Sequence, residues 1–245
     1  MPEEPAPENR EGLARRQPRR LPVRAVLFDL DGTLADTAAD LAAALNRVRA
    51  DRALPALPLA ILRPQASHGA RGLLSAGFGI GKEHADFGSL RDAFLAYYAE
   101  ALCEHTTLFP GADRVLAEIE RRGLRWGIVT NKAARFTVPV VERLALAARA
   151  GAVICGDTTA QSKPHPAPLL AGAAALGVRP PKCVYVGDAE RDIIAGRAAG
   201  MHTLFAAYGY VADDETPATW NADGALASLS DLLDWLPTTA DQTAA

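Results

Sequence analysis

The stretch Val26-Leu-Phe-Asp29-Leu-Asp31-Gly-Thr33 is an apolar, strand-like run that ends abruptly in two carboxylates spaced two residues apart. Burying even one unpaired carboxylate is costly unless a cation or hydrogen-bond donors compensate its charge. A hard divalent cation such as Mg2+ meets this need, because it binds oxygen ligands and keeps some coordination positions open. A solvent-exposed turn is the alternative, since Asp and Gly are both common in turns.

Three further polar signals follow in order, each at or just beyond the end of an apolar run. Trp126-Gly-Ile-Val-Thr130-Asn131-Lys132 ends in polar residues, and Cys183-Val-Tyr-Val-Gly187-Asp188 ends in a carboxylate that is repeated at Asp192. Lys163 lies between these two segments, in a loop rich in proline. In open parallel α/β sheets, ligands bind outside the carboxyl ends of the strands. We therefore expect the residues at these strand ends to converge on one site.

The chain around these segments alternates strand-like and helical patterns, which predicts an α/β fold with a parallel sheet covered by helices on both faces. The expected strands lie near 23–29, 125–130, 152–155, 183–187 and 202–206. The expected helices span 114–122, 139–147, 166–176 and 188–199. Residues 36–107 break the alternation, because they carry apolar residues at helical spacing and no convincing strand. They predict a helical domain inserted into the core.

The length of 245 residues allows one α/β core and a smaller domain. Residues 1–21 are rich in Pro, Glu and Arg and predict a disordered tail, and residues 237–245 predict a flexible end. The core is then expected to span 22–35 and 108–236, and the helical insertion 36–107.

The composition is that of an ordinary globular protein, with 49% hydrophobic residues and a net charge of -3. It favours neither a nucleic-acid partner nor a membrane, and no apolar run approaches the roughly 20 residues that span a bilayer. The start of the chain lacks the charged-then-apolar order of a secretory signal. Cys103, Cys155 and Cys183 are odd in number, show no Cys-x-x-Cys spacing and are expected to be buried thiols. A reducing cytoplasm is the expected location.

The four motifs, in this order, resemble those of the haloacid dehalogenase superfamily in its phosphatase branch, over roughly residues 23 to 236. The resemblance implies a Rossmann-like three-layer α/β/α core and makes residues 36–107 a C1 cap, a helical bundle that closes over the active site. The chain is similar to the phosphoglycolate phosphatase group through Phe28–Thr37 and Gly187–Asp192. Other segments, such as Arg125–Lys132 and Tyr208–Tyr210, look closer to its N-acetylmuramic acid 6-phosphate phosphatase members.

The resemblance also implies roles for the carboxylates. Asp29 would be the nucleophile that attacks phosphorus to give an aspartyl-phosphate, and Asp31 would be the general acid and base. Mg2+ would be the cofactor, held by the Asp29 carboxylate, the Asp31 main-chain carbonyl and Asp188. Asp192, one helical turn beyond Asp188, would support the site by orienting Lys163 or the metal's surroundings.

The remaining expected site residues bind phosphate or substrate. Thr130 and Lys163 would bind the transferring phosphoryl group. Substrate contacts are expected from Asn131 and, in the cap, from Ser67 and Arg71. Arg71 suits a carboxylate, and both 2-phosphoglycolate and N-acetylmuramic acid 6-phosphate, the substrates of the two phosphatase groups, carry one. Lys132, by contrast, is expected at the surface.

The expected function is Mg2+-dependent hydrolysis of a small carboxylate-bearing phosphoester, either 2-phosphoglycolate or N-acetylmuramic acid 6-phosphate. The alternative is a β-phosphoglucomutase-like phosphotransferase, which shares the motifs and the cap but protects its intermediate from water. A signalling receiver module also phosphorylates an Asp beside Mg2+. Receivers, however, are about half this size and lack a helical insertion after the acceptor Asp.

Overall fold

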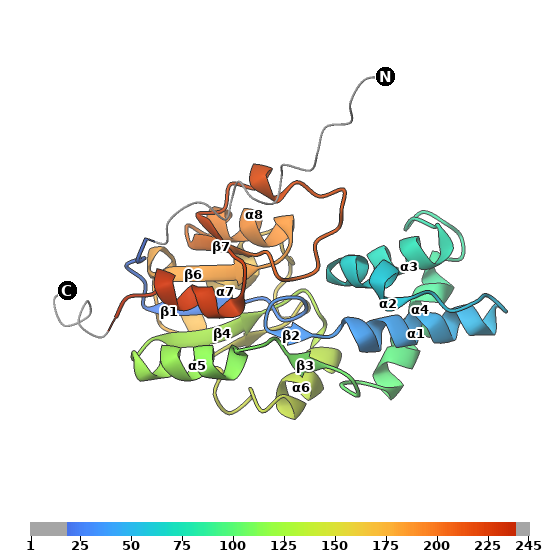
Figure 1. Cartoon of the computed structure of the whole chain (residues 1–245), viewed down its shortest axis with the longest axis horizontal. Helices are drawn as coiled ribbons and strands as arrows, with labels where there is room; N and C mark the ends of the chain where they lie inside the picture. The colour runs from blue at the N-terminus through green and yellow to red at the C-terminus, as the bar shows by residue number, and fades with distance from the viewer. Residues whose placement is uncertain (1–18, 239–245) are drawn as a thin grey trace, which may run out of the picture.

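A six-stranded parallel sheet forms the centre of the core (Figure 1). The computed structural model describes residues 19–238. The strand order is β5-β4-β1-β6-β7-β8. The strands are β1 (Ala25–Phe28), β4 (Arg125–Val129), β5 (Val153–Ile154), β6 (Cys183–Gly187), β7 (His202–Ala206) and β8 (Gly224–Leu226). All four residues of β1 are buried, because this strand pairs with β4 on one side and β6 on the other.

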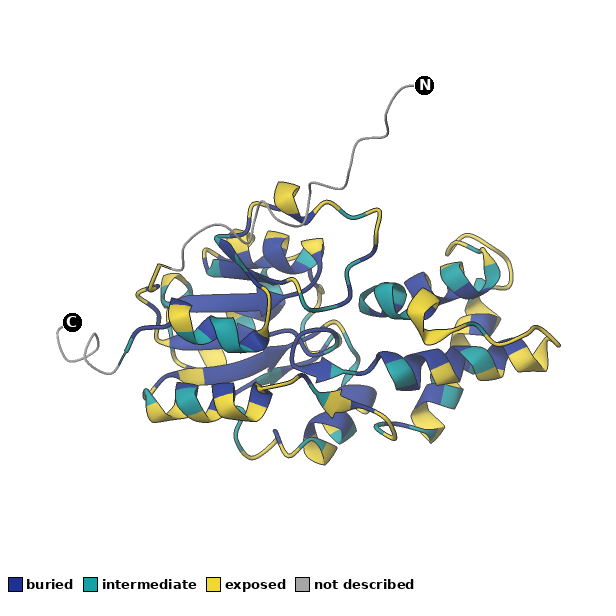
Figure 2. Cartoon of the chain, in the orientation of Figure 1, coloured by how far each residue is buried: buried dark blue, intermediate teal, exposed yellow. Residues whose placement is uncertain are grey.

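Helices cover both faces of the sheet. Side chains alternate along a strand, so Val26 and Phe28 pack on one face and Leu27 on the other. The face of Val26 is covered by α5 (Ala112–Arg121), α6 (Ala134–Arg143) and α9 (Leu232–Trp235). The face of Leu27 is covered by α7 (Ala167–Ala175) and α8 (Glu190–Ala198). Figure 2 shows buried strands between helices whose outer faces are exposed. The predicted α/β/α architecture is confirmed.

A helical insert lies beside the sheet in Figure 1, between the end of β1 and the start of α5. It consists of α1 (Ala38–Asp51), α2 (Leu59–Leu62), the 3-10 helix η1 (Arg63–His68), α3 (Gly69–Phe78) and α4 (Phe87–Glu100). An antiparallel ribbon of β2 (Ala35–Asp36) and β3 (Thr107–Leu108) joins the two chain segments that enter and leave the insert. The sequence did not reveal this ribbon, since two-residue strands show no alternating pattern.

Two expectations about elements were wrong. The helix expected over 139–147 is α6, which begins at Ala134 and contains Pro139. It begins early because the Ala134 N-H donates a hydrogen bond to the Asp157 carboxylate, 2.9 Å away and distant in sequence. The edge strand β8 was not expected. Cys155 and Cys183 are buried thiols as expected, but Cys103 is only half-buried.

The predicted tails fall largely outside the described residues. Leu21, the last residue of the predicted N-terminal tail, is buried, and its N-H donates to the Trp235 carbonyl at 2.7 Å. Pro237, the first residue of the predicted C-terminal tail, is also buried. Within residues 19–238 the helices are too short or too polar for any of them to span a membrane.

Candidate active site

A cavity of about 560 Å³ lies between the carboxyl ends of the strands and the helical insert. Asp29, which directly follows β1, and Thr130, which directly follows β4, line its core side. The insert contributes the η1 segment and α4, through residues such as Ser67 and Tyr98. The topology therefore brings strand ends that are a hundred residues apart in sequence to one site, as the motif order predicts.

Asp29 is the most deeply placed carboxylate of the cavity wall, with 2% of its surface exposed. Its Oδ1 accepts a hydrogen bond from the Leu30 N-H at 2.8 Å and lies 3.0 Å from the Lys163 ammonium. Burial raises the pKa of Asp29 above its ordinary value, and the positive charge of Lys163 opposes that rise. The adjacent cation thus favours the ionised, nucleophilic form of a carboxylate that burial disfavours.

Lys163 is fully buried, and its ammonium is surrounded by oxygen atoms. Nζ lies 2.8 Å from Asp192 Oδ1 and 3.0 Å from Asp29 Oδ1, and it donates to the Tyr185 hydroxyl at 2.7 Å and the Val129 carbonyl at 3.1 Å. An ammonium has three N-H donors, so these partners commit all of them. Lys163 therefore holds Asp29 and Asp192 together beneath the cavity.

Asn131 fixes the backbone of this lysine. Its side-chain Nδ2 donates to the Lys163 carbonyl, and its Oδ1 accepts from the Lys163 N-H, both at 2.9 Å. The loop that carries Lys163 is thereby tied to the end of β4. Thr130 is buried, and its Oγ1 accepts the Lys132 N-H at 3.1 Å, which shapes the turn after the strand.

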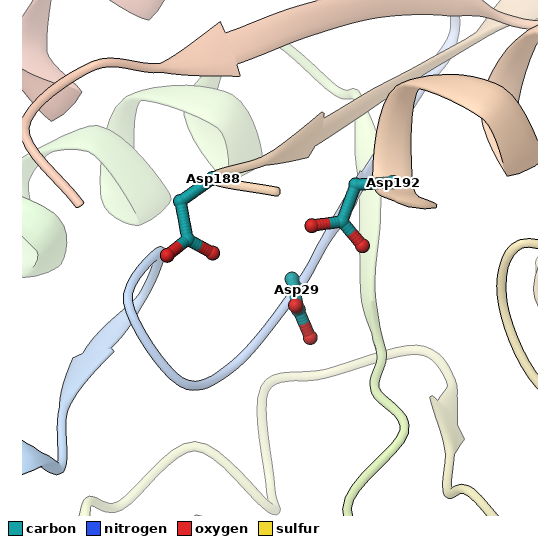
Figure 3. Close-up of side chains that lie close together, drawn as sticks. All are labelled: Asp29, Asp188 and Asp192. Atoms are coloured by element: carbon teal, nitrogen blue, oxygen red, sulfur yellow. The ribbon is translucent and has the colours of Figure 1, made fainter. Parts of the chain in front are cut away.

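Asp29, Asp188 and Asp192 form a buried cluster in which one oxygen of each lies within 4.8 Å of the others (Figure 3). Burial, reinforced by the charges of Asp192 and Asp29, raises the pKa of Asp188 to about 7. Burial alone would also raise the pKa of Asp192, but Lys163 and Arg191 outweigh it and hold that pKa below its ordinary value. Closely spaced, buried carboxylate oxygens with incompletely balanced charge fit a hard cation such as Mg2+.

Asp31 is not part of this cluster, and its carboxylate has different partners. Oδ1 accepts hydrogen bonds from Lys132 Nζ at 2.8 Å and from Thr37 Oγ1 at 2.6 Å. The Lys132 side chain is 8% exposed and its ammonium lies 4.5 Å from the centre of the Tyr98 ring. The expectation that Lys132 lies at the surface was wrong, because its ion pair with Asp31 and the ring of Tyr98 enclose it. Burial disfavours its charge, but these neighbours prevail and raise the pKa of Lys132.

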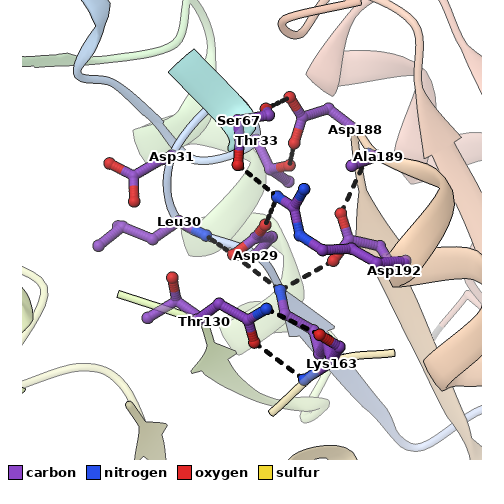
Figure 4. A network of polar contacts seen from close by, with 12 residues as sticks. Asp29, Leu30, Asp31, Thr33, Ser67, Thr130, Lys163, Asp188, Ala189 and Asp192 are labelled. Carbon is purple, nitrogen blue, oxygen red and sulfur yellow. Dashed lines mark hydrogen bonds and ion pairs between the residues drawn. The ribbon is translucent and has the colours of Figure 1, made fainter. Parts of the chain in front are cut away.

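The insert contacts the carboxylate cluster through Ser67 (Figure 4). Its hydroxyl donates to Asp188 Oδ2, and its carbonyl accepts from Arg191 Nη2 at 2.8 Å. Arg71, also expected to bind substrate, is exposed and lines the cavity on the insert side. Arg191 was not singled out from the sequence, although it directly precedes Asp192. Its position inside the Gly187–Asp192 motif was the available signal.

Residues 26–206 match the family model described as haloacid dehalogenase-like hydrolase. The chain belongs to this family. The hydrolase is 39% identical over 218 residues to the N-acetylmuramic acid 6-phosphate phosphatase of Pseudomonas aeruginosa. This match covers 89% of the chain and 96% of the relative. The hydrolase is 45% identical over 204 residues to the phosphoglycolate phosphatase of Xanthomonas campestris, covering 82% of the chain and 90% of the relative.

Solved structures of the family share the fold of this hydrolase. The crystal structure of a predicted phosphoglycolate phosphatase from Haemophilus somnus superimposes with a TM-score of 0.75 at 26% identity, covering 86% of this chain and 97% of that one. The predicted resemblance to the haloacid dehalogenase superfamily, near its phosphoglycolate and N-acetylmuramic acid 6-phosphate phosphatases, is confirmed.

The expected site residues of the hydrolase divide into two groups in space. Most of them line the cavity, namely Asp29, Asp31, Ser67, Arg71, Thr130, Asn131 and Lys163. Asp188 and Asp192 are fully buried and do not line it. The two groups meet at Asp29, which belongs to the cavity wall and to the carboxylate cluster.

Proposed function

We propose that this hydrolase is a Mg2+-dependent phosphomonoesterase that transfers the phosphoryl group of a small carboxylate-bearing ester first to Asp29 and then to water. The observation that carries the proposal is the position of the Asp29 carboxylate. It is buried at the cavity wall, yet Lys163 lies 3.0 Å and Arg191 3.9 Å from its oxygens. A carboxylate in a cavity whose ionised form is favoured by neighbouring cations is suited to nucleophilic attack on phosphorus.

In this reaction Asp29 accepts the phosphoryl group and Asp31 transfers the protons. An Asp29 oxygen forms a bond to phosphorus while the ester P-O bond breaks, and Asp31 gives its proton to the departing alkoxide. Asp31 then takes a proton from the water that attacks the aspartyl-phosphate, which releases inorganic phosphate and restores the Asp29 carboxylate and the protonated Asp31. Lys132, 2.8 Å from Asp31 Oδ1, orients the acid-base group.

Mg2+ would be held by the carboxylates of Asp29 and Asp188, with the Asp31 main-chain carbonyl. The bound cation supplies positive charge that offsets repulsion between the nucleophile and its anionic target. Asp192 would support this site indirectly, because it holds Lys163 at 2.8 Å and accepts the Ala189 N-H at 3.0 Å.

The volume and the apolar lining of the cavity favour the larger of the two candidate substrates. The cavity volume of about 560 Å³ lies well within the about 300–1,000 Å³ of sites that enclose drug-sized ligands. The side chains of Leu41, Phe94 and Phe136 form an apolar part of the cavity wall. A two-carbon phosphoester is too small to cover it. We therefore propose N-acetylmuramic acid 6-phosphate as the preferred substrate and 2-phosphoglycolate as a poorer one, with Arg71 pairing with the carboxylate.

The three free thiols support a reducing compartment, so we propose the cytoplasm as the location. The proposed partner is the small-molecule substrate, with no nucleic acid or membrane involved.

The test is Mg2+-dependent phosphate release from the two substrates side by side, compared as kcat/KM. Asp29→Asn, which keeps the shape of the side chain but removes the nucleophilic oxygen charge, is the blank. We expect turnover by the wild type, a preference for the amino sugar ester, and loss of essentially all activity in Asp29→Asn. Normal turnover by Asp29→Asn would refute the nucleophile, and a strong preference for 2-phosphoglycolate would refute the substrate assignment.

A further inference from the structure

Arg191 is a cation of the cavity that the reaction scheme above uses only for its charge beside Asp29. It belongs to α8 and lines the cavity with a side chain that is 19% exposed. Nη2 lies 3.9 Å from Asp29 Oδ2 and donates to the Ser67 carbonyl of η1 at 2.8 Å. Its Nε is buried and has no hydrogen-bond partner among the described residues. A buried donor without an acceptor is costly, so a missing acceptor is indicated there.

Lys163 cannot fill the need for a direct donor to the phosphoryl group. Its ammonium is fully buried and already faces the oxygens of Asp29, Asp192, Tyr185 and Val129. A hydrogen bond to a phosphoryl oxygen would require it to release one of these partners. Lys163 therefore acts on the phosphoryl group through its charge, and a donor with free N-H groups has to come from elsewhere.

We propose that Arg191 is a catalytic residue that donates hydrogen bonds to the oxygens of the phosphoryl group being transferred to Asp29. The inference rests on the proposed role of Asp29. A guanidinium presents its N-H groups as a planar fork that matches phosphate oxygens, and it keeps its charge at all working pH values. The place beside Asp29 Oδ2 is where charge develops during attack, and donors there stabilise the transition state.

The contact with Ser67 makes this donor depend on the helical insert. The Ser67 carbonyl belongs to η1, whereas Arg191 belongs to the core, so their 2.8 Å hydrogen bond exists only while η1 lies over the site. The bond removes rotational freedom from a long side chain and fixes the guanidinium beside Asp29. Docking of the insert thus orients the donor as it covers the cavity.

Arg191→Gln and Arg191→Lys test the proposal, with Arg197→Gln as the matched control. Arg197 lies on the same helix, is exposed, and donates to the Asn221 carbonyl away from the cavity. Each variant is assayed with N-acetylmuramic acid 6-phosphate and with 2-phosphoglycolate, a small ester that leaves most of the cavity empty. Binding of inorganic phosphate is measured separately by calorimetry with Mg2+ present, and circular dichroism checks that each variant is folded.

We expect Arg191→Gln to lower kcat/KM about 10²–10³-fold on both esters, as removal of a transition-state donor does elsewhere. We also expect its affinity for inorganic phosphate to fall about tenfold, with Arg191→Lys intermediate in both measurements because it keeps the charge but not the fork.

Two results would overturn the proposal. One is activity of Arg191→Gln within about threefold of Arg197→Gln on both esters. The other is a loss confined to the amino sugar ester with phosphate affinity unchanged, since Arg191 would then only hold η1. Absence of phosphate release by the wild type would instead refute the proposed function, and the phosphate affinities would still decide whether Arg191 binds the anion.

Discussion

The two carboxylates of Asp29-Leu-Asp31 have different surroundings although only one residue separates them. Asp29 is buried beside Lys163 in the carboxylate cluster, whereas Asp31 accepts hydrogen bonds from Lys132 and Thr37 on the cavity side. Carboxylates in distinct environments can serve as nucleophile and as acid-base group in one reaction. An extended chain would place the two side chains on one face, but β1 ends at Phe28 and the chain turns at Leu30, whose carbonyl accepts the Leu34 and Ala35 N-H groups, so Asp31 is directed into different surroundings.

Lys132 is predicted to hold the acid-base carboxylate in place. Replacing it in Lys132→Met removes the donor at 2.8 Å from Asp31 and leaves the carboxylate with Thr37 as its partner. We expect kcat to fall about 10²-fold, within the range that general acid-base catalysis contributes, and KM to change less. Steady-state kinetics measures both. Lys82→Met, at an exposed lysine, is the control, and a kcat equal to that control would contradict the role.

The three thiols are predicted to resist alkylation near neutral pH. Burial raises the pKa of Cys183 to about 11 and also raises those of Cys155 and Cys103. The thiolate is the reactive form, and at a pH below a raised pKa the thiol keeps its proton. We expect iodoacetamide at pH about 8 to label the folded protein slowly, with half-buried Cys103 first and Cys183 last as pH rises. Mass spectrometry gives the order, and rapid labelling of Cys183 would contradict it.

At the scale of elements, the strands that carry the site were predictable because they are buried on both faces. Such strands are continuous apolar runs, as in β1 and β6, and a polar residue after the run marks the functional edge. The start of α6 was not predictable, because its first N-H is satisfied by Asp157 from a distant loop. β8 has three residues at the edge of the sheet, too few for a pattern.

The site residues divide in the same way. The places of Asp29 and Asp188 in the site could be predicted from the sequence, because each residue directly follows a strand. The tasks of Lys132 and Arg191 depend on contacts with the helical insert, through Tyr98 and Ser67, and a sequence gives no distance between separate elements. Motif position therefore indicated that these residues lie near the site, but the tasks of Lys132 and Arg191 depend on packing between the insert and the core, which the motifs do not show.

Tyr210 is predicted to anchor the first helix of the insert to the core. Its hydroxyl accepts hydrogen bonds from the Thr37 and Ala38 N-H groups, at 2.7 and 3.0 Å, and donates to Asp36 Oδ1 at 2.8 Å. It thereby satisfies N-H groups at the start of α1 that have no partner within the helix. We expect Tyr210→Phe to lower the free energy of unfolding by about 1–2 kcal/mol, as loss of a helix cap does.

Urea denaturation measures this change, and kinetics is expected to show a larger rise in KM than fall in kcat, because we propose that the insert supplies substrate contacts. Tyr208→Phe is the matched control, since the Tyr208 hydroxyl donates to the Thr33 carbonyl of the core at 2.9 Å and makes no hydrogen bond with α1 among the described residues. Equal destabilisation in the two variants, with KM unchanged in both, would show that Tyr210 does not anchor the insert.

At the scale of the whole molecule, the candidate active site is also where the core and the insert are joined. Ser67 of the insert donates to Asp188 of the core, and Arg191 of the core donates to Ser67. Charge in the carboxylate cluster is therefore linked to the contact between the two parts. A cation that neutralises the cluster is expected to stabilise the molecule as well as to assist the reaction.

The Asp188→Asn variant tests two effects of charge in the cluster, namely its effect on the stability of the metal-free protein and its effect on Mg2+ binding. Burial, together with the negative charges of Asp192 and Asp29, disfavours the ionised Asp188 carboxylate and raises its pKa to about 7, so at pH about 8 this charge destabilises the metal-free protein. We expect the substitution to raise the metal-free Tm by about 2–4 °C, corresponding to about 1 kcal/mol in a chain of this length. Mg2+ is expected to raise the Tm of the wild type and of Asp234→Asn, an exposed control, but not that of Asp188→Asn. A lower metal-free Tm together with an undiminished Mg2+ response in Asp188→Asn would show that repulsion within the cluster does not limit stability and that Asp188 does not bind the metal.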